Sequence, residues 1–303
     1  MVERLTVGYI LGEEVASALN TCSAIVALES TVITHGLPRP ENLHLGRGME
    51  VEVRAGGATP ATIAVLDGAV HIGLTSQELD LLASLENLRK ISRRDLGIVQ
   101  ARSECGGTTI AATMIAGHAA GIQVLATGGI GGVHRDAPFD ISADLPEMGR
   151  TPMIVVCAGA KAILDLPATV EYFETAGVPI LGYQTDAFPA FYSPDSGLPV
   201  NLRVDTPEEV AAVAHAQWGQ GLSAGLLVVV PPPADHAMSS EKVEDAIQVA
   251  LKGANKQGVR GQAMTPFLLA RVSALTGGAS LQANLSLLHN NGRIAANIAR
   301  ALL

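Results

Sequence analysis

Short runs of apolar, often β-branched residues alternate with Ala-rich stretches along most of the chain. The apolar runs predict buried strands, because strands covered on both faces of a sheet have nearly continuous apolar sequence. The predicted strands lie at Ala24–Leu28, Thr62–Leu66, Val70–Gly73, Val124–Thr127, Met153–Cys157, Val178–Tyr183 and Leu226–Val230. The predicted helices lie at Glu41–Ala55, Thr109–Ala119, Lys161–Thr175, Thr206–Trp218, Ser239–Lys252 and Pro266–Thr276, with a last helical segment over residues 281–303. This alternation indicates an α/β protein with three α/β/α layers around a largely parallel sheet.

The length of 303 residues fits either two domains or one large α/β domain. No internal repeat or low-complexity tract divides the sequence. The most loop-like segment, Asp186–Asp205, is rich in Pro, Ser, Gly and Asp and contains Phe188, Phe191 and Tyr192. It is either a linker or an ordered loop over a pocket. We predict a single domain over residues 1–303.

Composition and charge exclude several classes of protein. Apolar residues make up 48% of the chain and charged residues 16%, which argues against a disordered or fibrous protein. The net charge of −9, without a basic stripe, argues against a nucleic acid polymer as partner. The longest uncharged apolar stretches, around Gly225–Val230 and Met153–Ala160, are shorter than the roughly 18 residues that a membrane span needs.

The cysteines and the N-terminus indicate a reduced, cytoplasmic compartment. Cys22, Cys105 and Cys157 are too few and too scattered for a disulfide framework, and none forms a Cys-x-x-Cys pair. The first residues lack the basic leader and the small-residue cleavage site of a secretory signal.

Polar residues gather where predicted strands end, which is where open α/β sheets bind ligands. Glu29 terminates the strand Ala24–Leu28 and is followed by hydroxyl residues and His35. A carboxyl group at the end of a buried strand can have a raised pKa and serve as a proton donor. The alternative interpretation is a helix cap or a surface carboxylate.

Two glycine-rich segments could bind an anion. Gly106–Thr109 opens a predicted helix and Thr127–Gly132 follows a predicted strand, so both offer backbone N–H groups and hydroxyls to a sugar phosphate. The sequence TGGIGG does not match the dinucleotide fingerprint and no Walker pattern is present, which argues against NAD and ATP. Each segment could equally be a tight turn, and the neighbouring His134–Arg135 could face solvent.

Asp140, Ser142 and Asp144 alternate with apolar residues, so in an extended segment their side chains would share one face. One or two carboxylates with waters suit a hard cation such as Mg²⁺ or Mn²⁺. The alternative is helix capping ahead of Leu145–Met148.

Lys161 follows the strand Met153–Cys157 and stands at the start of the predicted helix Lys161–Thr175. The partial positive charge of a helix N-terminus, together with burial, would lower the pKa of its amine. A neutral amine is a nucleophile that can form an imine with a sugar carbonyl. The alternative is a solvated surface lysine. In the last helical segment, Asn284 either faces water or holds a hydroxyl or ring carbonyl through its amide.

Nine segments together resemble the pseudouridine-5′-phosphate glycosidase family. They are ALESTVITHGLPRPEN, GATPATIAVLDG, ISRRDL, GGTTIAATM, ATGGIGGVHR, FDISADL, VVCAGAKAILD, GYQTDAFPAFYS and QANLSLLHNN, in order from about Val26 to Arg293. The resemblance implies a mixed-sheet α/β/α fold, a homotrimer and one manganese ion per subunit. It also implies reversible conversion of pseudouridine 5′-phosphate to uracil and ribose 5-phosphate.

The resemblance implies roles for single residues. Lys161 matches the nucleophile that forms a covalent imine intermediate with the ribose, and Glu29 matches the proton donor. Such covalent catalysis suits a carbon–carbon glycosidic bond, because carbon is a poor leaving group. Asp140 matches the manganese ligand, with waters filling most of the coordination.

Contacts to the small-molecule substrate are implied for Lys90, Ile110, Thr127, His134, Ser142, Ala143, Asp144 and Asn284. Among them we expect Thr127 and His134 to contact the phosphate and Asn284 to contact the base. Two other functions stay open: an imine-forming lyase or aldolase that uses Lys161 on another sugar phosphate, and a non-catalytic sugar-phosphate sensor.

Overall fold

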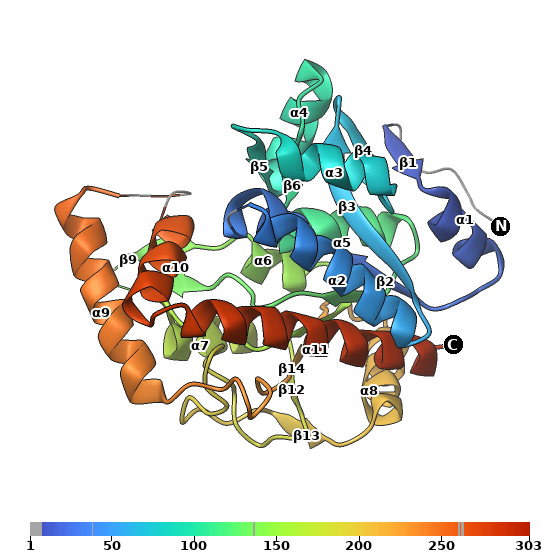
Figure 1. Ribbon diagram of the computed structural model, residues 1–303. Coiled ribbons are helices and arrows are strands. Elements are labelled where there is room, and N and C mark those ends of the chain that lie inside the picture. Colours follow the sequence, from blue (N-terminus) through green and yellow to red (C-terminus); the bar gives the residue numbers. More distant parts are fainter. Residues whose placement is uncertain (1–7, 38, 136, 260, 262–263) are drawn as a thin grey trace.

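A computed structural model describes residues 8–37, 39–135, 137–259, 261 and 264–303 (Figure 1). Its main sheet has 11 strands within these residues. They are β1 (Tyr9–Leu11), β2 (Ile25–Leu28), β3 (Thr59–Leu66), β4 (Ala69–Ile72), β5 (Arg89–Ile91), β6 (Gly106–Thr108), β7 (Val124–Ala126), β10 (Ile154–Cys157), β12 (Ile180–Tyr183), β13 (Leu202–Val204) and β14 (Leu226–Val229). A separate three-stranded sheet contains β8 (Val133–His134), β9 (Ala137–Ile141) and β11 (Leu164–Asp165).

The main sheet is mixed and largely parallel. Its main path runs β1-β4-β3-β2-β7-β10-β14-β12-β13, and every pair from β3 to β13 is parallel. Strands β4 and β6 pair antiparallel with β3. The predicted fold class is therefore confirmed. All seven strands predicted from apolar runs are present, with ends that differ by a few residues.

Helices cover both faces of this sheet. They are α1 (Glu13–Asn20), α2 (Glu41–Ala55), α3 (Ser76–Ser84), α4 (Leu96–Arg102), α5 (Ile110–Ala119), α6 (Asp144–Met148), α7 (Leu166–Ala176), α8 (Pro207–Gly219), α9 (Ser240–Lys256), α10 (Met264–Leu275) and α11 (Ala279–Ala301). Helices α2 and α11 pack together in front of the sheet (Figure 1). Successive residues of β2 point to opposite faces. Leu28 accordingly lies beside Met49 of α2, whereas Ala27 lies against Gly117 of α5. The α/β/α layering follows from these contacts.

Two local predictions were wrong. The helix predicted from Lys161 begins at Leu166, because the carboxylate of Asp165 caps it by accepting the Ala168 N–H at 3.0 Å. Residues 161–163 form a loop, so Lys161 does not stand at a helix N-terminus. Residues 140–144 are not one extended segment either, because β9 ends at Ile141 and α6 begins at Asp144.

The segment Asp186–Asp205 is built into the structure. It contributes β13 to the sheet beside β12. Phe188, Phe191 and Tyr192 are buried in the main core. These contacts favour the ordered-loop interpretation over the linker. The single domain over residues 1–303 stays a prediction, and residues 1–7 lie outside the described part. Among the described helices, none combines the length and the apolarity that crossing a bilayer requires.

Candidate active site

Three neighbouring parallel strands end at one edge of the main sheet, and each leads to a residue that the sequence singled out. Strand β7 lies between β2 and β10. Glu29 directly follows β2 and Thr127 directly follows β7, while residues 158–160 lead from β10 to Lys161. Because the carboxyl ends of parallel strands meet at the same edge, these three residues come to one site.

The cavity at this edge has two chambers. The smaller, inner chamber has apolar side chains in its wall, from Val32, Phe191, Pro266, Leu269 and Leu288, and polar side chains that include His35, Thr127 and Asn284. The outer chamber has a volume of about 500 Å³ and is lined by polar side chains that include Arg93, Arg94, Thr109, His134, Asp140, Ser142 and Asp144. The residues that line both chambers are Glu29, Thr31, Lys90, Lys161 and Thr265. This third group stands where the chambers meet.

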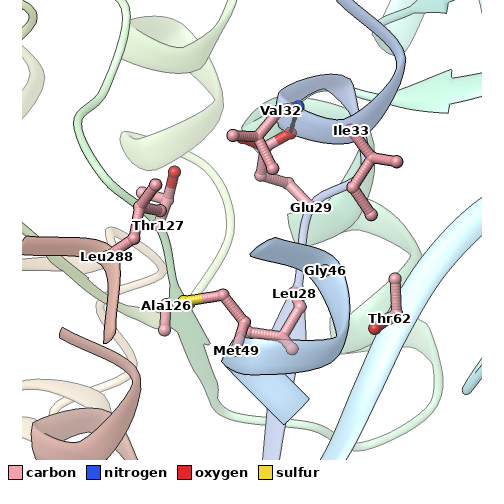
Figure 2. A pocket seen from close by; sticks show the side chains of 10 residues that line it. All are labelled: Leu28, Glu29, Val32, Ile33, Gly46, Met49, Thr62, Ala126, Thr127 and Leu288. Carbon is pink, nitrogen blue, oxygen red and sulfur yellow. Dashed lines mark hydrogen bonds between the residues drawn. The ribbon is translucent and has the colours of Figure 1, made fainter. Parts of the chain in front are cut away.

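Glu29 is the buried carboxyl group of the site, with 9% of its surface exposed. Its Oε2 accepts the hydroxyl of Thr31 at 2.6 Å and the backbone N–H of Val32 at 3.1 Å. Figure 2 shows Glu29 beside Val32, above a small apolar cavity walled by Met49 and Leu288. Burial raises the pKa of Glu29, although the Thr31 hydrogen bond and the charge of Lys161 oppose the rise. The expectation of a raised pKa at this strand end is therefore supported.

Lys161 is held by its backbone rather than by a helix. Its N–H donates to the Ile130 carbonyl at 3.1 Å, next to a parallel bridge between Ile130 and Ala160. Beneath this loop, burial raises the pKa of the Cys157 thiol to about 12, so the thiol is un-ionised and unreactive at neutral pH. Lys90, on β5, is the second amine of the site. Burial and the neighbouring charge of Lys161 both lower the pKa of Lys90.

Asp144 is buried and connects two of the segments around the site. Its carboxylate accepts the Ala111 N–H at 3.1 Å and the Gly131 N–H at 2.9 Å. It therefore fixes the start of α5 against the glycine-rich loop. Gly131 is required in that loop, because a Cβ there would lie 2.1 Å from the Ser142 hydroxyl oxygen.

His134 and Asp140 border the outer chamber. Burial lowers the pKa of His134, the charge of Asp140 opposes this effect, and the charges of Lys90 and Lys161 add to it. Asp140 itself is exposed. The described residues contain no group of three His, Cys, Asp or Glu that could hold a metal ion. A cation at Asp140 would therefore need waters for most of its coordination, which hard divalent cations accept.

The structure brings most of the predicted residues together. Glu29, Lys90 and Lys161 meet at the junction, and the outer chamber collects Ile110, His134, Asp140, Ser142, Ala143 and Asp144. Thr127 and Asn284 line the inner chamber instead. The two expected phosphate contacts, Thr127 and His134, thus do not share a chamber.

Several lining residues were missed. Thr31 lies two positions after Glu29, so the hydroxyls noted behind this carboxyl were a usable signal. Arg93 lines the outer chamber and pairs with the buried Glu147 at 2.5 Å and 2.7 Å. Thr265 and Leu269 come from α10, which is remote in sequence and has no recognisable motif, so only the fold could place them.

Comparisons with known proteins identify the family of this chain. Residues 14–301 match the family described as indigoidine synthase A like protein. A pseudouridine-5′-phosphate glycosidase of Chloroflexus aurantiacus is 54% identical over 295 residues, covering 95% of this chain and 97% of the relative. The glycosidase of the same name from Solibacter usitatus is 52% identical over 291 residues, covering 95% and 97%.

Two solved structures share the fold over nearly the full length. The prealnumycin C-glycosynthase AlnA, solved in complex with ribulose 5-phosphate, has a TM-score of 0.90 and 38% identity and covers 98% of this chain and 97% of its own. An indigoidine synthase A-like protein from Thermotoga maritima has a TM-score of 0.89 and 33% identity, with 100% and 99% coverage. The resemblance drawn from the sequence motifs is confirmed: the chain belongs to the indigoidine synthase A like family, alongside the pseudouridine-5′-phosphate glycosidases.

Proposed function

We propose that this protein is an enzyme that reversibly cleaves the carbon–carbon glycosidic bond of pseudouridine 5′-phosphate, giving uracil and ribose 5-phosphate. The observation that carries the proposal is the junction between the chambers, where the amine of Lys161 and the buried carboxyl of Glu29 line one cavity. Apolar side chains in the wall of the inner chamber and polar side chains around the outer chamber suit a substrate with a flat base at one end and a phosphate at the other.

The base belongs in the inner chamber under this proposal. Phe191, Leu269 and Leu288 offer apolar surface to a flat ring, and the amide of Asn284 can hydrogen-bond a ring carbonyl. The phosphate then belongs in the outer chamber, near His134 and Ser142. Thr127 would face the base or the ribose rather than the phosphate, because it lines the inner chamber.

In the proposed reaction Lys161 is the nucleophile and Glu29 is the proton donor. Opening of the ribose ring breaks the bond between C1′ and the ring oxygen, the amine of Lys161 bonds to C1′, and the amine proton that is lost passes to the released oxygen. Glu29 then delivers its proton to C5 of the base while the C1′–C5 bond breaks, and the nitrogen lone pair forms the imine. Water hydrolyses the imine and releases ribose 5-phosphate. The raised pKa of Glu29 keeps the carboxyl protonated to a higher pH than an exposed Glu, as a proton donor requires.

We also propose that one Mn²⁺ ion binds at Asp140, with waters filling the rest of its coordination. The exposed carboxylate at the outer chamber supports this, because hard cations bind through one carboxylate and several waters. When bound, the ion would supply positive charge beside the phosphate. On the family resemblance we further propose a homotrimer that acts in the cytoplasm. Sedimentation velocity tests the trimer, and a monomer at all concentrations would contradict it.

The test is incubation of the protein with pseudouridine 5′-phosphate and Mn²⁺, followed by chromatographic detection of uracil. Lys161→Ala serves as the paired variant, because it removes the amine without removing a core side chain. We expect uracil from the wild type and none from the variant. Cleavage of a different sugar phosphate through Lys161 would favour the lyase, and tight binding without turnover would favour the sensor.

A further inference from the structure

The two carboxyl oxygens of Glu29 are not equivalent. Oε2 accepts two hydrogen bonds, from the Thr31 hydroxyl at 2.6 Å and from the Val32 N–H at 3.1 Å. No described residue donates a hydrogen bond to Oε1. Glu29 and Thr31 both line the inner and outer chambers, so this arrangement lies where the substrate would bind.

The unequal bonding determines where a proton can reside. An un-ionised carboxyl has one O–H donor and keeps acceptor capacity on its other oxygen. Oε2 already accepts two hydrogen bonds, so a proton placed there would have to reverse the bond with the Thr31 hydroxyl and would weaken Oε2 as an acceptor for the Val32 N–H. The hydrogen bonding therefore favours the proton on Oε1, the oxygen that is free to transfer it.

We propose that Thr31 is a positioning residue, which holds Oε2 of Glu29 as an acceptor and so directs the transferable proton to Oε1. This inference rests on the proposed function, in which Glu29 protonates the base. The local fold supports this role. Thr31 directly precedes the π-helical turn Val32–Gly36, and at the start of this turn the Thr31 hydroxyl and the Val32 N–H both donate to Oε2 of Glu29.

The charged surroundings define what the hydroxyl contributes. Lys161 and Asp144 act on Glu29 with opposite signs, Lys90 lies near enough to be affected by Glu29, and His35 lines the inner chamber. Against this background the Thr31 hydroxyl stabilises the carboxylate and lowers the pKa of Glu29. Its removal should therefore raise that pKa further, while the charged neighbours stay in place.

The experiment compares Thr31→Val, which has nearly the same shape without the hydroxyl, with Thr31→Ser, which restores a donor. Thr34→Val is the matched control, because the Thr34 hydroxyl lies in the same turn but bonds Ser30 and His35 instead of Glu29. The pKa of Glu29 is read without substrate from the ¹³C carboxyl resonance that Glu29→Gln removes. Uracil release is measured against pH in parallel, and thermal unfolding verifies that each variant folds.

In Thr31→Val we expect the Glu29 titration and the basic limb of the pH–rate profile to move upward together by about one pH unit. The maximal rate should fall about tenfold or more, because one charge-assisted hydrogen bond no longer orients the donor. Thr31→Ser should recover most of both effects, and Thr34→Val should leave the Glu29 titration unchanged.

An unchanged Glu29 titration in a folded Thr31→Val protein would overturn the proposal, as would a slower rate with an unmoved basic limb. The titration needs no substrate, so it separates this inference from the proposed function. If the wild type released no uracil, the function would fail, whereas the titration would still decide whether Thr31 controls the carboxyl.

Discussion

Glu29→Gln is the sharpest test of the proton donor. Glutamine keeps the length and shape of the side chain, and its carbonyl oxygen can still accept the Thr31 hydroxyl and the Val32 N–H. The variant should therefore fold normally and bind the substrate, yet it has no carboxyl proton to give. General acid catalysis contributes roughly 10²–10⁴ in rate, equivalent to about 2.7–5.5 kcal/mol of transition-state stabilisation.

Two measurements define the result. Single-turnover release of uracil should slow by roughly 10²–10⁴ in Glu29→Gln. In the wild type, cleavage should fall as the pH rises through the pKa of Glu29, which burial raises above its usual range. Unfolding gives a matched control: the variant should gain stability relative to the wild type over that same pH range, because only the wild type must charge a buried carboxyl.

A folded Glu29→Gln protein that releases uracil within a few-fold of the wild-type rate would refute the role of Glu29 as proton donor. A large loss with an unchanged pH profile would also count against Glu29 as the titrating donor. Loss of folding would make the rates uninformative, so the thermal midpoint is measured first.

Three further predictions follow from the site. Borohydride reduction in the presence of ribose 5-phosphate should add the mass of the reduced sugar to the peptide that carries Lys161, and modification of the Lys90 peptide instead would reassign the nucleophile. Asp140→Ala should weaken the dependence of activity on added Mn²⁺, and an unchanged metal titration would show that the ion binds elsewhere. Gly131→Ala should lower the free energy of unfolding by about 1–3 kcal/mol, because the new methyl group would overlap the Ser142 side chain. Gly97→Ala, which meets open space, is its control and should be neutral or stabilising in urea unfolding.

The sequence predicted the parts of the fold that are controlled by apolar burial. Strands β7 and β10 are buried throughout and could be identified as short apolar runs. Strand β5, with the sequence RKI, and strand β6, with the sequence GGT, carry no such signal, because pairing with neighbours rather than apolar burial makes them strands. The helix expected at Lys161 failed for a similar reason, since β11 pairs with β8 before α7 can begin.

In the site, too, local features could be predicted from the sequence and long-range contacts could not. Glu29 could be proposed from its place at the end of an apolar strand, which is a local property of the sequence. The phosphate assignment of Thr127 could not be checked in this way, because its chamber depends on α11, whose Asn291 donates to the Thr127 carbonyl at 2.8 Å. Thr265 reaches the junction only through the packing of α10 against the rest of the fold. No short sequence pattern predicts contacts between segments that are remote in the chain.

The catalytic residues and the residues that face the base come from different parts of the fold, and this has an evolutionary consequence. The proton donor directly follows β2 and the amine lies in the loop after β10, whereas Leu269 and Leu288, which face the proposed position of the base, belong to α10 and α11. Substitutions on these helices can therefore change the shape of the chamber that faces the base, while Lys161 and Glu29 keep their positions. Proteins with this fold could therefore evolve to accept a different carbon-linked ring through substitutions on α10 and α11, with the same catalytic residues.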